Sequence, residues 1–388
     1  MIRYVIPDSW IKYDLVRVSG PLVNAKAAVL ALGSVPYQRS WAEKLQAVQL
    51  KREVEGTSRI EGAEFSEPEL EIALRETPEQ LATRSQKQAA AAVGAYRWIA
   101  RLPEDRPLDD KLILEIHRRI VTGADDDHCE PGKLRGADEN VTFGLPRHRG
   151  ANGGSECARA FAQLCAAARE MRGHDPLIQA LAVHYHLAAM HPFMDGNGRT
   201  ARALEAFLLQ KQGLRDTLFI AMSNYYYEEK NDYLSVLAQV RQDRHDLGAF
   251  LVFGLKGIEK QCMRLLDEIK KNIAKSLFRD TMHDLFGRLQ NKRKRVIAER
   301  QLKILEALLE SDMSVDEMLK RSAYLYRKLQ KPARAFEQDL IKLLFLRAID
   351  FDSEQKIISA RMEWPVEITE MEFFERIEQL PKAKTRIL

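Results

Sequence analysis

The 388-residue sequence lacks several features that would set it apart from ordinary globular proteins. No run of about 20 apolar residues is apparent, and the first residues lack an apolar core followed by a small-residue cleavage site. We therefore expect no membrane-spanning helix, no interaction with a membrane, and a cytoplasmic location. The four cysteines form no CxxC pair and have no metal-ligand spacing, so they predict free thiols in a reducing compartment.

A strong excess of one charge is also missing. The sequence has 60 Lys or Arg and 56 Asp or Glu, and a formal net charge of +4 is too small to indicate nucleic-acid binding by itself. Hydrophobic residues (45%) and charged residues (30%) occur in proportions that exclude collagen-like, disulfide-scaffold and wholly disordered proteins. The length exceeds one ordinary core, so we expect two or three domains.

Most of the sequence has helical periodicity, which predicts a mainly α fold. Residues 177–189 form an apolar stripe that follows Asp175-Pro176, a capping residue with proline in the first turn. Residues 131–154 break this pattern, because clustered Gly and Pro surround a short strand at 141–143. This composition predicts a surface loop or a short β-hairpin.

The composition changes near residue 260. From Lys260 to Lys303 there are 13 Lys or Arg against 5 Asp or Glu, which we interpret as a solvated helical connector. Beyond it, residues 296–309, 314–320 and 332–346 predict three helices, and residues 356–364 predict a small β-ribbon. Three helices followed by a ribbon is the order of a winged-helix domain.

The chemistry is concentrated in residues 191–202, HPFMDGNGRTAR, which lie between two predicted helices. Pro192 ends the first helix because the residue before a proline resists the helical conformation. Gly196 and Gly198 permit a tight turn whose N–H groups converge on an anion. The positive end of the second helix faces the same point, so this turn is suited to binding phosphate.

Charged side chains flank the turn. Arg199 and Arg202 are three residues apart on the second helix, and two forked guanidiniums suit a polyphosphate. Asp195 is the obvious oxygen ligand for Mg²⁺, and His191 is able to accept a proton near neutral pH. The segment thus supplies a base, a metal ligand, an anion cradle and a charge clamp.

Other site types fit less well. The segment matches neither GxxxxGK[ST] nor GxGxxG. The proximity of His184, His186 and His191 raises the question of zinc, but HExxH is absent and no Cys or carboxylate completes an obvious ligand set. For His184 and His186 we therefore favour packing, or support of a neighbouring site residue, over metal ligation.

The string HPFMDGNGRTAR matches the Fic-family motif HPFx(D/E)GNGRxxR at every specified position, and the sequence resembles that family over roughly residues 35–260. Leu187-Ala188 departs from the Phe-Glu that many relatives carry before the motif histidine, which affects packing near the loop. The resemblance implies a Fic-type helical bundle with a hairpin flap and a winged-helix companion. The expected parts are an N-terminal helical region at 1–105 with an inhibitory helix at about 40–62, a Fic catalytic domain at 106–258, a basic helical connector at 259–295, and a winged-helix-like domain and tail at 296–388.

The resemblance implies transfer of AMP from ATP, with Mg²⁺, to a Ser, Thr or Tyr hydroxyl of a target protein. His191 would deprotonate that hydroxyl, and Asp195 would hold Mg²⁺ between the α- and β-phosphates. The resemblance also implies a phosphate cradle made by Gly196, Asn197, Gly198 and Thr200, and a clamp on the β- and γ-phosphates made by Arg199 and Arg202. The adenine would be bordered by Tyr233 and Leu234. A flap that adds a strand to the target would be formed by Val141, Thr142, Phe143 and Gly144.

Residues 57–62, TSRIEG, fit the family's inhibitory motif (S/T)xxxE(G/N), with Thr57 and Glu61 as its key positions. Taken alone, Ser58 and Glu61 also fit an ordinary capping box. Upstream of a full Fic motif, the inhibitory interpretation is favoured. Glu61 would then pair with Arg202, removing one clamp on the γ-phosphate and placing ATP in a non-productive pose. In some family members this glutamate also helps to remove AMP, which is a further hypothesis for Glu61.

Three alternatives stay open. A Fic-type enzyme that moves UMP or phosphocholine is one, although the arginine clamp favours a triphosphate. A DNA-binding regulator acting through residues 296–366 is another, but Glu337 and Asp339 on its candidate recognition helix count against DNA. A weak homodimer is compatible with the sequence, because burying the inhibitory helix at a subunit contact would make inhibition depend on concentration.

Overall fold

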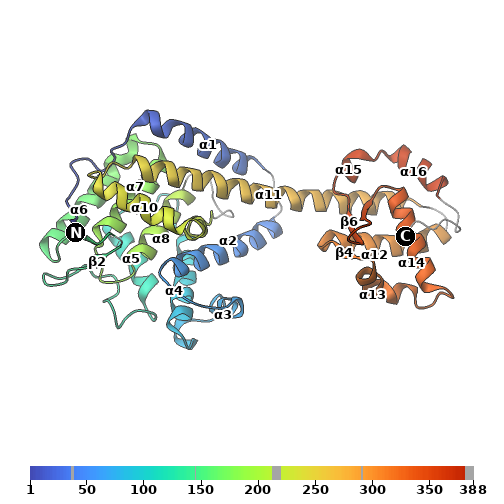
Figure 1. Ribbon diagram of the computed structural model, residues 1–388, viewed down its shortest axis with the longest axis horizontal. Helices are drawn as coiled ribbons and strands as arrows, with labels where there is room; N and C mark the ends of the chain where they lie inside the picture. The colour runs from blue at the N-terminus through green and yellow to red at the C-terminus, as the bar shows by residue number, and fades with distance from the viewer. Residues whose placement is uncertain (36–38, 145, 212–219, 290–291, 381–388) are drawn as a thin grey trace. The chain divides into compact units, whose positions relative to one another are not determined.

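The computed structural model describes the chain except residues 36–38, 145, 212–219, 290–291 and 381–388. The chain divides into two compact units, Met1–Asp267 and Glu268–Leu388. Figure 1 shows that both are built mainly from helices, so the predicted fold class is confirmed. Residues 290–291 of the expected connector and 381–388 of the expected tail lie outside the described residues.

The first unit contains a helical bundle and one small sheet. Its helices are α1 (Leu15–Ser34), α2 (Arg39–Ile60), α3 (Glu67–Ala73), η1 (Pro78–Gln80), α4 (Arg84–Ile99), α5 (Asp110–Val121), α6 (Ser155–Glu170), η2 (Met171–Gly173), α7 (Pro176–Met190), α8 (Asn197–Gln210), α9 (Met222–Glu228), α10 (Lys230–Gln242) and the first part of α11 (Gly248–Gly287). Helix α7 packs against α8, and α2 packs against α9.

Helix α7 is the centre of this bundle. Thirteen of its 15 residues are buried, as expected for a helix that is apolar on every side. Its predicted start is confirmed, because the Asp175 carboxylate accepts a hydrogen bond from the N–H of Leu177 at 2.9 Å. The helix ends at His191, whose positive φ of 52° turns the chain toward α8.

The small sheet carries the hairpin that was expected to form a flap. Strand β3 (His148–Arg149) lies between β1 (Ile2–Arg3), which is parallel to it, and β2 (Thr142–Phe143), which is antiparallel. The predicted strand at 141–143 is confirmed for two residues, whereas Val141 contributes its carbonyl to the N–H of Gly150 at 3.2 Å. Because β3 is the central strand, β1 and β2 are both edge strands of this sheet.

Helix α2 follows the expected inhibitory helix closely and is pressed against α9. At Gly56 an added Cβ would collide with the backbone carbonyl of Ser223. Beside this contact, the buried Glu53 carboxylate accepts from the N–H of Ser223 at 2.7 Å and from the hydroxyl of Tyr96 at 2.8 Å. Gly56 thus permits a close helix contact, and Glu53 fastens α2 to both α9 and α4.

Helix α1 corrects the expectation that no segment is long and apolar enough to cross a membrane. It has 20 residues, a mean hydropathy of 1.4, and only 28% of its apolar window buried. Val16, Val23 and Leu30 are exposed along it. One such helix is weak support for a membrane span, because core helices and signal sequences satisfy the same criteria.

The second unit begins within α11 and contains a three-stranded sheet with order β4-β6-β5. Its further elements are α12 (Lys292–Glu310), β4 (Met313–Ser314), α13 (Val315–Tyr326), α14 (Pro332–Phe345), β5 (Ile349–Asp352), β6 (Ile357–Ala360), α15 (Trp364–Glu367) and α16 (Glu370–Glu378). The three predicted helices are present, and the assignment to the winged-helix class stays a prediction.

The predicted ribbon of this unit was partly wrong. Strand β5 at Ile349–Asp352 was missed, and the run to Trp364 is not a strand, since β6 ends at Ala360. The indole of Trp364 is buried and donates to the carbonyl of Leu346 at 3.0 Å, and Pro365 follows in the first turn of α15. A buried anchor with proline after it starts a helix here, which an apolar pattern alone does not distinguish from a strand.

Candidate functional site

The turn between α7 and α8 requires its glycines. Gly196 caps α8 with φ 73°, and an added Cβ would lie 2.7 Å from the Val121 side chain. At Gly198, an added Cβ would collide with the Glu61 carboxylate. Gly196 therefore supplies the left-handed backbone, and Gly198 supplies space in which a carboxylate already lies.

Asn197, which was expected in the phosphate cradle, has a side chain that holds the turn itself together. Its amide closes the turn: the oxygen accepts from the N–H of Phe193 at 2.9 Å, and the nitrogen donates to the carbonyl of Phe193 at 2.8 Å. Phe193 is fully buried and stacks on His117 with ring centroids 3.7 Å apart. Asn197 thus shapes the loop with a side chain that is itself 3% exposed.

His191 is held in the form that accepts a proton. Its Nδ1 lies 2.7 Å from the carbonyl of Ala188, which only accepts hydrogen bonds, so Nδ1 carries the proton and Nε2 keeps its lone pair. Burial lowers the His191 pKa to about 4, even though the Ala188 carbonyl and the Glu61 charge favour the cation. At neutral pH the ring is therefore uncharged and its Nε2 is a base.

The hairpin covers one face of this imidazole. The Phe143 ring stacks on His191 with centroids 3.7 Å apart and planes 9° apart, and the Arg241 guanidinium lies 5.2 Å from the Phe143 centroid. Stacking covers the π-face of an imidazole and leaves its edge open. Of the expected flap residues, Phe143 touches the base directly, whereas Thr142 is exposed and Gly144 makes the turn with φ 74°.

Arg135, which the sequence analysis missed, connects the hairpin with the motif. Its buried guanidinium donates to the carbonyls of His191 at 2.7 Å, Glu139 at 2.6 Å and Ala151 at 2.5 Å. Its own N–H donates to the carbonyl of Pro192 at 3.0 Å. No short motif marks this arginine, because its partners are main-chain atoms that are remote in sequence.

Arg202 is surrounded by the segment that contains the expected inhibitory motif. Its Nη2 donates to the Glu61 carboxylate at 2.5 Å, and its Nε donates to the Thr57 hydroxyl at 2.9 Å. Its Nη1 reaches the Tyr233 hydroxyl at 3.5 Å. Desolvation raises the pKa of Glu61, but the charge and hydrogen bond of Arg202, together with the charge of Arg199, outweigh it, so the pKa lies below its ordinary value. The Glu61 carboxylate is thus an anion held beside Gly198 and Arg202.

The two residues expected beside the adenine differ in position. Tyr233 is buried, and its hydroxyl also bonds to His184 Nε2 at 2.9 Å, whereas Leu234 is 43% exposed. His184 bonds in turn to the buried Glu205, and His186 bonds to the carbonyl of Trp10 at 2.7 Å. Both histidines are therefore buried and hydrogen-bonded, and His184 supports Tyr233 from behind.

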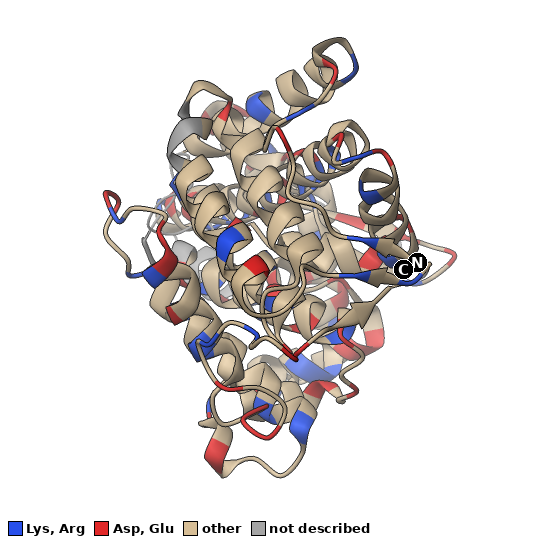
Figure 2. Ribbon diagram, turned by 90° about the vertical axis from the view of Figure 1, so that its left-hand side faces the viewer, with Lys and Arg blue, Asp and Glu red and all other residues tan. Residues whose placement is uncertain are grey.

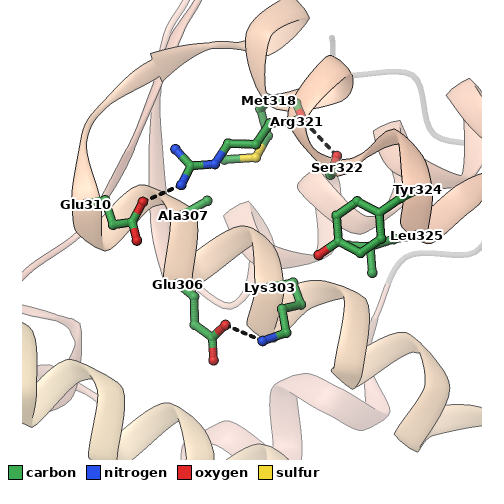
Figure 3. A pocket seen from close by; sticks show the side chains of 9 residues that line it. All are labelled: Lys303, Glu306, Ala307, Glu310, Met318, Arg321, Ser322, Tyr324 and Leu325. Carbon is green, nitrogen blue, oxygen red and sulfur yellow. Dashed lines mark hydrogen bonds and ion pairs between the residues drawn. The ribbon is translucent and has the colours of Figure 1, made fainter.

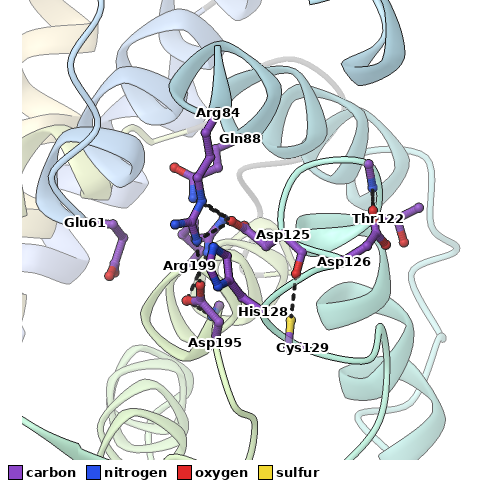
Figure 4. A network of polar contacts seen from close by, with 12 residues as sticks. Glu61, Arg84, Gln88, Thr122, Asp125, Asp126, His128, Cys129, Asp195 and Arg199 are labelled. Atoms are coloured by element: carbon purple, nitrogen blue, oxygen red, sulfur yellow. Dashed lines mark hydrogen bonds and ion pairs between the residues drawn. The ribbon is translucent and has the colours of Figure 1, made fainter. Parts of the chain in front are cut away.

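Arg199 belongs to a different ion-pair network from Arg202, although three residues separate them. Figure 4 shows Arg199 beside Asp125 and Asp195, and its Nη atoms lie 2.6 Å and 3.3 Å from these carboxylates. Arg84 pairs with both acids as well, at 2.6 Å and 3.0 Å. Neither Arg84 nor Asp125 was predicted, because they lie 111 and 70 positions from Asp195 in sequence and belong to no motif.

A divalent metal fits Asp195 only as a partner of other ligands. No group of three or more His, Cys, Asp or Glu able to hold a metal occurs among the described residues. Asp195 is 34% exposed and presents a carboxylate, the ligand that Mg²⁺ prefers in proteins. Magnesium commonly takes one or two carboxylates and completes its shell with phosphates and water, so the donor chemistry fits a metal that arrives with a nucleotide.

The Thr200 hydroxyl and the four cysteines complete this description. The Thr200 hydroxyl is buried and has no hydrogen-bond partner among the described residues. Cys129, Cys157, Cys165 and Cys262 are free thiols, as predicted.

A hollow with a volume of about 210 Å³ lies in the second unit, away from the motif turn in the sequence. Figure 3 shows its paired charges: Lys303 lies 2.7 Å from Glu306, and Arg321 pairs with Glu310. Basic and acidic residues are likewise interspersed in the view of Figure 2. The motif turn in the first unit therefore stays the candidate site.

Comparison with known proteins agrees with this choice. A family model described as Fic/DOC family matches residues 107–209. Protein adenylyltransferase Fic of Aedes aegypti is 33% identical over 126 residues, covering 32% of this chain and 24% of that protein. Protein adenylyltransferase fic-1 of Caenorhabditis briggsae is 33% identical over 114 residues, covering 27% of this chain and 20% of that protein. The chain thus spans about a quarter or less of the length of these relatives.

Solved structures share the fold at low sequence identity. Fic-1 from C. elegans aligns with a TM-score of 0.55 and 18% identity, covering 66% of this chain and 74% of that chain. A Fic family protein from Desulfovibrio desulfuricans G20 aligns with a TM-score of 0.57 and 14% identity, covering 92% of this chain and 98% of that chain. Residues 107–209 therefore match the Fic/DOC family model, and the chain shares its fold with solved Fic proteins.

Proposed function

We propose that this chain is a protein adenylyltransferase that transfers AMP from ATP to a Ser, Thr or Tyr hydroxyl of a target protein. The observation that carries the proposal is the neutral His191, whose Nδ1 is fixed on the Ala188 carbonyl beside a helix N-terminus suited to phosphate. The names of the matched relatives support the same reaction.

The transfer is a single in-line displacement. The hydroxyl oxygen attacks the α-phosphorus while its proton passes to Nε2 of His191, the bond to the β-phosphate oxygen breaks, and pyrophosphate leaves. The open edge of the imidazole, rather than the face covered by Phe143, takes the proton. Asp195 would hold Mg²⁺, which neutralises phosphate charge when bound. The N–H groups at Gly198 and Arg199 and the two guanidiniums would orient the phosphates.

We further propose that Glu61 inhibits this reaction. Its carboxylate occupies the space above Gly198 and accepts a hydrogen bond from the Nη2 of Arg202. A γ-phosphate at this place would be repelled by the carboxylate and would lack its hydrogen bond from Arg202. Thr57 strengthens the contact by holding the Nε of the same arginine. As part of the same proposal, Glu61 also orients water for the removal of AMP from a modified target. The test is release of AMP from a purified modified target, which Glu61→Ala should abolish.

The test compares Glu61→Gly with the double variant Glu61→Gly/His191→Ala. Incubation with ATP, Mg²⁺ and a cell lysate, followed by mass spectrometry, should reveal a 5′-AMP adduct on the chain itself or a partner with the first variant only. An adduct that persists in the double variant contradicts the base assignment. Competition with UTP, GTP and CDP-choline distinguishes ATP from the other donors.

A second candidate function, DNA binding by the second unit, is favoured by the position of Asp339. Asp339 was expected to weaken DNA binding from the candidate recognition helix, but that expectation was wrong for this residue. Its side chain is buried and accepts from Arg300 Nε at 2.8 Å and the Tyr326 hydroxyl at 3.0 Å, so it does not face solvent. Meanwhile the turn between α13 and α14 exposes Arg327, Lys328 and Lys331.

Duplex DNA binding by this turn predicts a salt-dependent affinity that falls in Lys328→Glu/Lys331→Glu of the full chain. The double substitution Lys270→Glu/Lys271→Glu changes the charge equally at exposed positions of α11 and serves as the control. Equal affinity of the two variants, or no retention of DNA at low salt, excludes this candidate.

A further inference from the structure

The carboxylate expected to bind metal already has a cation at each oxygen. Asp195 Oδ2 accepts from Arg84 Nη2 at 3.0 Å. Asp195 Oδ1 accepts from Arg199 Nη2 at 3.3 Å and from the N–H of Gly196 at 2.6 Å. A divalent metal bound to either oxygen would therefore lie beside a guanidinium, whose positive charge opposes the binding.

The two arginines are not equally able to leave. Arg199 is 2% exposed and is fixed by Asp125 at 2.6 Å. Arg84 is the first residue of α4, and its side chain is 49% exposed. Figure 4 shows Arg84 reaching both acids from its own helix. Because Arg84 also bonds to Asp125 through Nε at 2.7 Å, it is able to give up Asp195 and keep its other partner.

The charges around Asp195 make this contact a competition. The pairs Arg84–Asp125, Arg84–Asp195 and Arg199–Asp195 join two cations with two anions, so the cluster has no net charge. Removing the guanidinium of Arg84 leaves a net negative charge beside Asp195 and frees Oδ2. Both changes favour a divalent cation.

We propose that Arg84 is a built-in competitor of the divalent metal at Asp195, displaced when the metal arrives with a nucleoside triphosphate. The inference rests on the proposed function, since it takes Asp195 as the metal ligand. Arg84 is a positioning residue in this proposal, because it acts on metal occupancy through Asp195. It also sets a preference: a metal that brings phosphates and their charge overcomes the contact more readily than the hydrated metal alone.

The test measures metal binding directly and does not depend on transfer. Free Mn²⁺ is followed by electron paramagnetic resonance during titration of the full chain, with and without α,β-methylene-ATP. All proteins carry Glu61→Gly, so that the carboxylate above Gly198 does not exclude phosphate. We expect Arg84→Ala to bind Mn²⁺ about tenfold more tightly than its parent. Arg97→Ala, which removes the same charge from an exposed position of α4, should match the parent.

The outcomes distinguish this inference from the proposed function. The gain in Arg84→Ala should disappear when Asp195→Ala is added. Unchanged or weaker Mn²⁺ binding in Arg84→Ala, together with a loss in Asp195→Ala, overturns the competition and leaves the metal assignment intact. If Asp195→Ala binds Mn²⁺ as tightly as the parent, the metal assignment itself fails. Arg84→Gln, which keeps hydrogen-bonding groups without charge, should reproduce most of the gain and shows that charge is the cause.

Discussion

At the scale of single residues, main-chain partners determine what His191 does. A histidine on a surface loop titrates near its ordinary pKa of 6.5, but here burial lowers the pKa to about 4 and the Ala188 carbonyl fixes the tautomer. The protein therefore needs no neighbouring carboxylate to deprotonate the base. Two further residues fix the position of the imidazole. Phe143 stacks on the face of the ring, and Arg135 donates a hydrogen bond to the His191 carbonyl.

The low pKa of His191 predicts a broad pH profile. Because the neutral imidazole is the active form in the proposed reaction, kcat/KM of Glu61→Gly should show no fall assignable to His191 between pH 8 and pH 6, and a loss only as the pH approaches about 4. Radiolabelled AMP transfer measured in buffers of constant ionic strength checks this. A half-maximal rate near pH 6.5 contradicts the assignment.

Arg135 has a similar local prediction. Lysine in its place keeps the charge but cannot donate to three separated carbonyls, so Arg135→Lys should lower kcat about tenfold and leave the KM for ATP nearly unchanged. The comparison uses initial rates of transfer in the Glu61→Gly background. A rise in KM alone would place Arg135 in nucleotide binding instead.

At the scale of elements, close packing against α9 fixes the position of α2, the helix proposed to be inhibitory. Gly56→Ala adds a methyl group that collides with the Ser223 carbonyl, so it should destabilise the protein by about 1–3 kcal/mol although Ala is the better helix former. Gly94→Ala in α4 has no atom within 4 Å of the new Cβ and should stabilise by about 0.5–1 kcal/mol. Urea unfolding measures both, and equal signs would contradict this account of Gly56.

The same helix contains a pH-sensitive group. Burial raises the pKa of Glu53 from 4.5 to about 7, against the hydrogen bonds from Ser223 and Tyr96. The folded protein thus binds more protons than the unfolded chain in this window, and Glu53 makes stability fall as the pH rises from about 4.5 to about 7. Glu53→Gln should flatten this part of the stability curve in urea titrations. An unchanged slope contradicts the assignment to Glu53.

At the scale of the whole molecule, the sequence predicted features that depend on neighbouring residues better than contacts between residues that are far apart in the chain. The motif turn, the α7 cap and the helix over the inhibitory segment follow from residues that are near each other in sequence. Arg84, Asp125 and Arg135 do not, because each meets its partners only after folding, over separations of up to 111 positions. The strand β5 and the start of α15 at Trp364 were misjudged because short apolar runs do not distinguish strand from helix.

Nucleotide binding should change the stability of the chain only when the Glu61 carboxylate is removed. A ligand at about 100 times its Kd stabilises a folded protein by roughly 2.7 kcal/mol, which raises the Tm of the unit that binds it by several degrees. Because Glu61 occupies the space above Gly198 and the Nη2 of Arg202, ATP with Mg²⁺ should raise the Tm of Glu61→Gly clearly more than that of the wild type. Differential scanning calorimetry checks this, with Glu64→Gly, three residues along the chain and exposed, as the matched control. Equal shifts in the wild type and Glu61→Gly would show that Glu61 does not oppose ATP binding, and inhibition would then have to act on the pose of bound ATP.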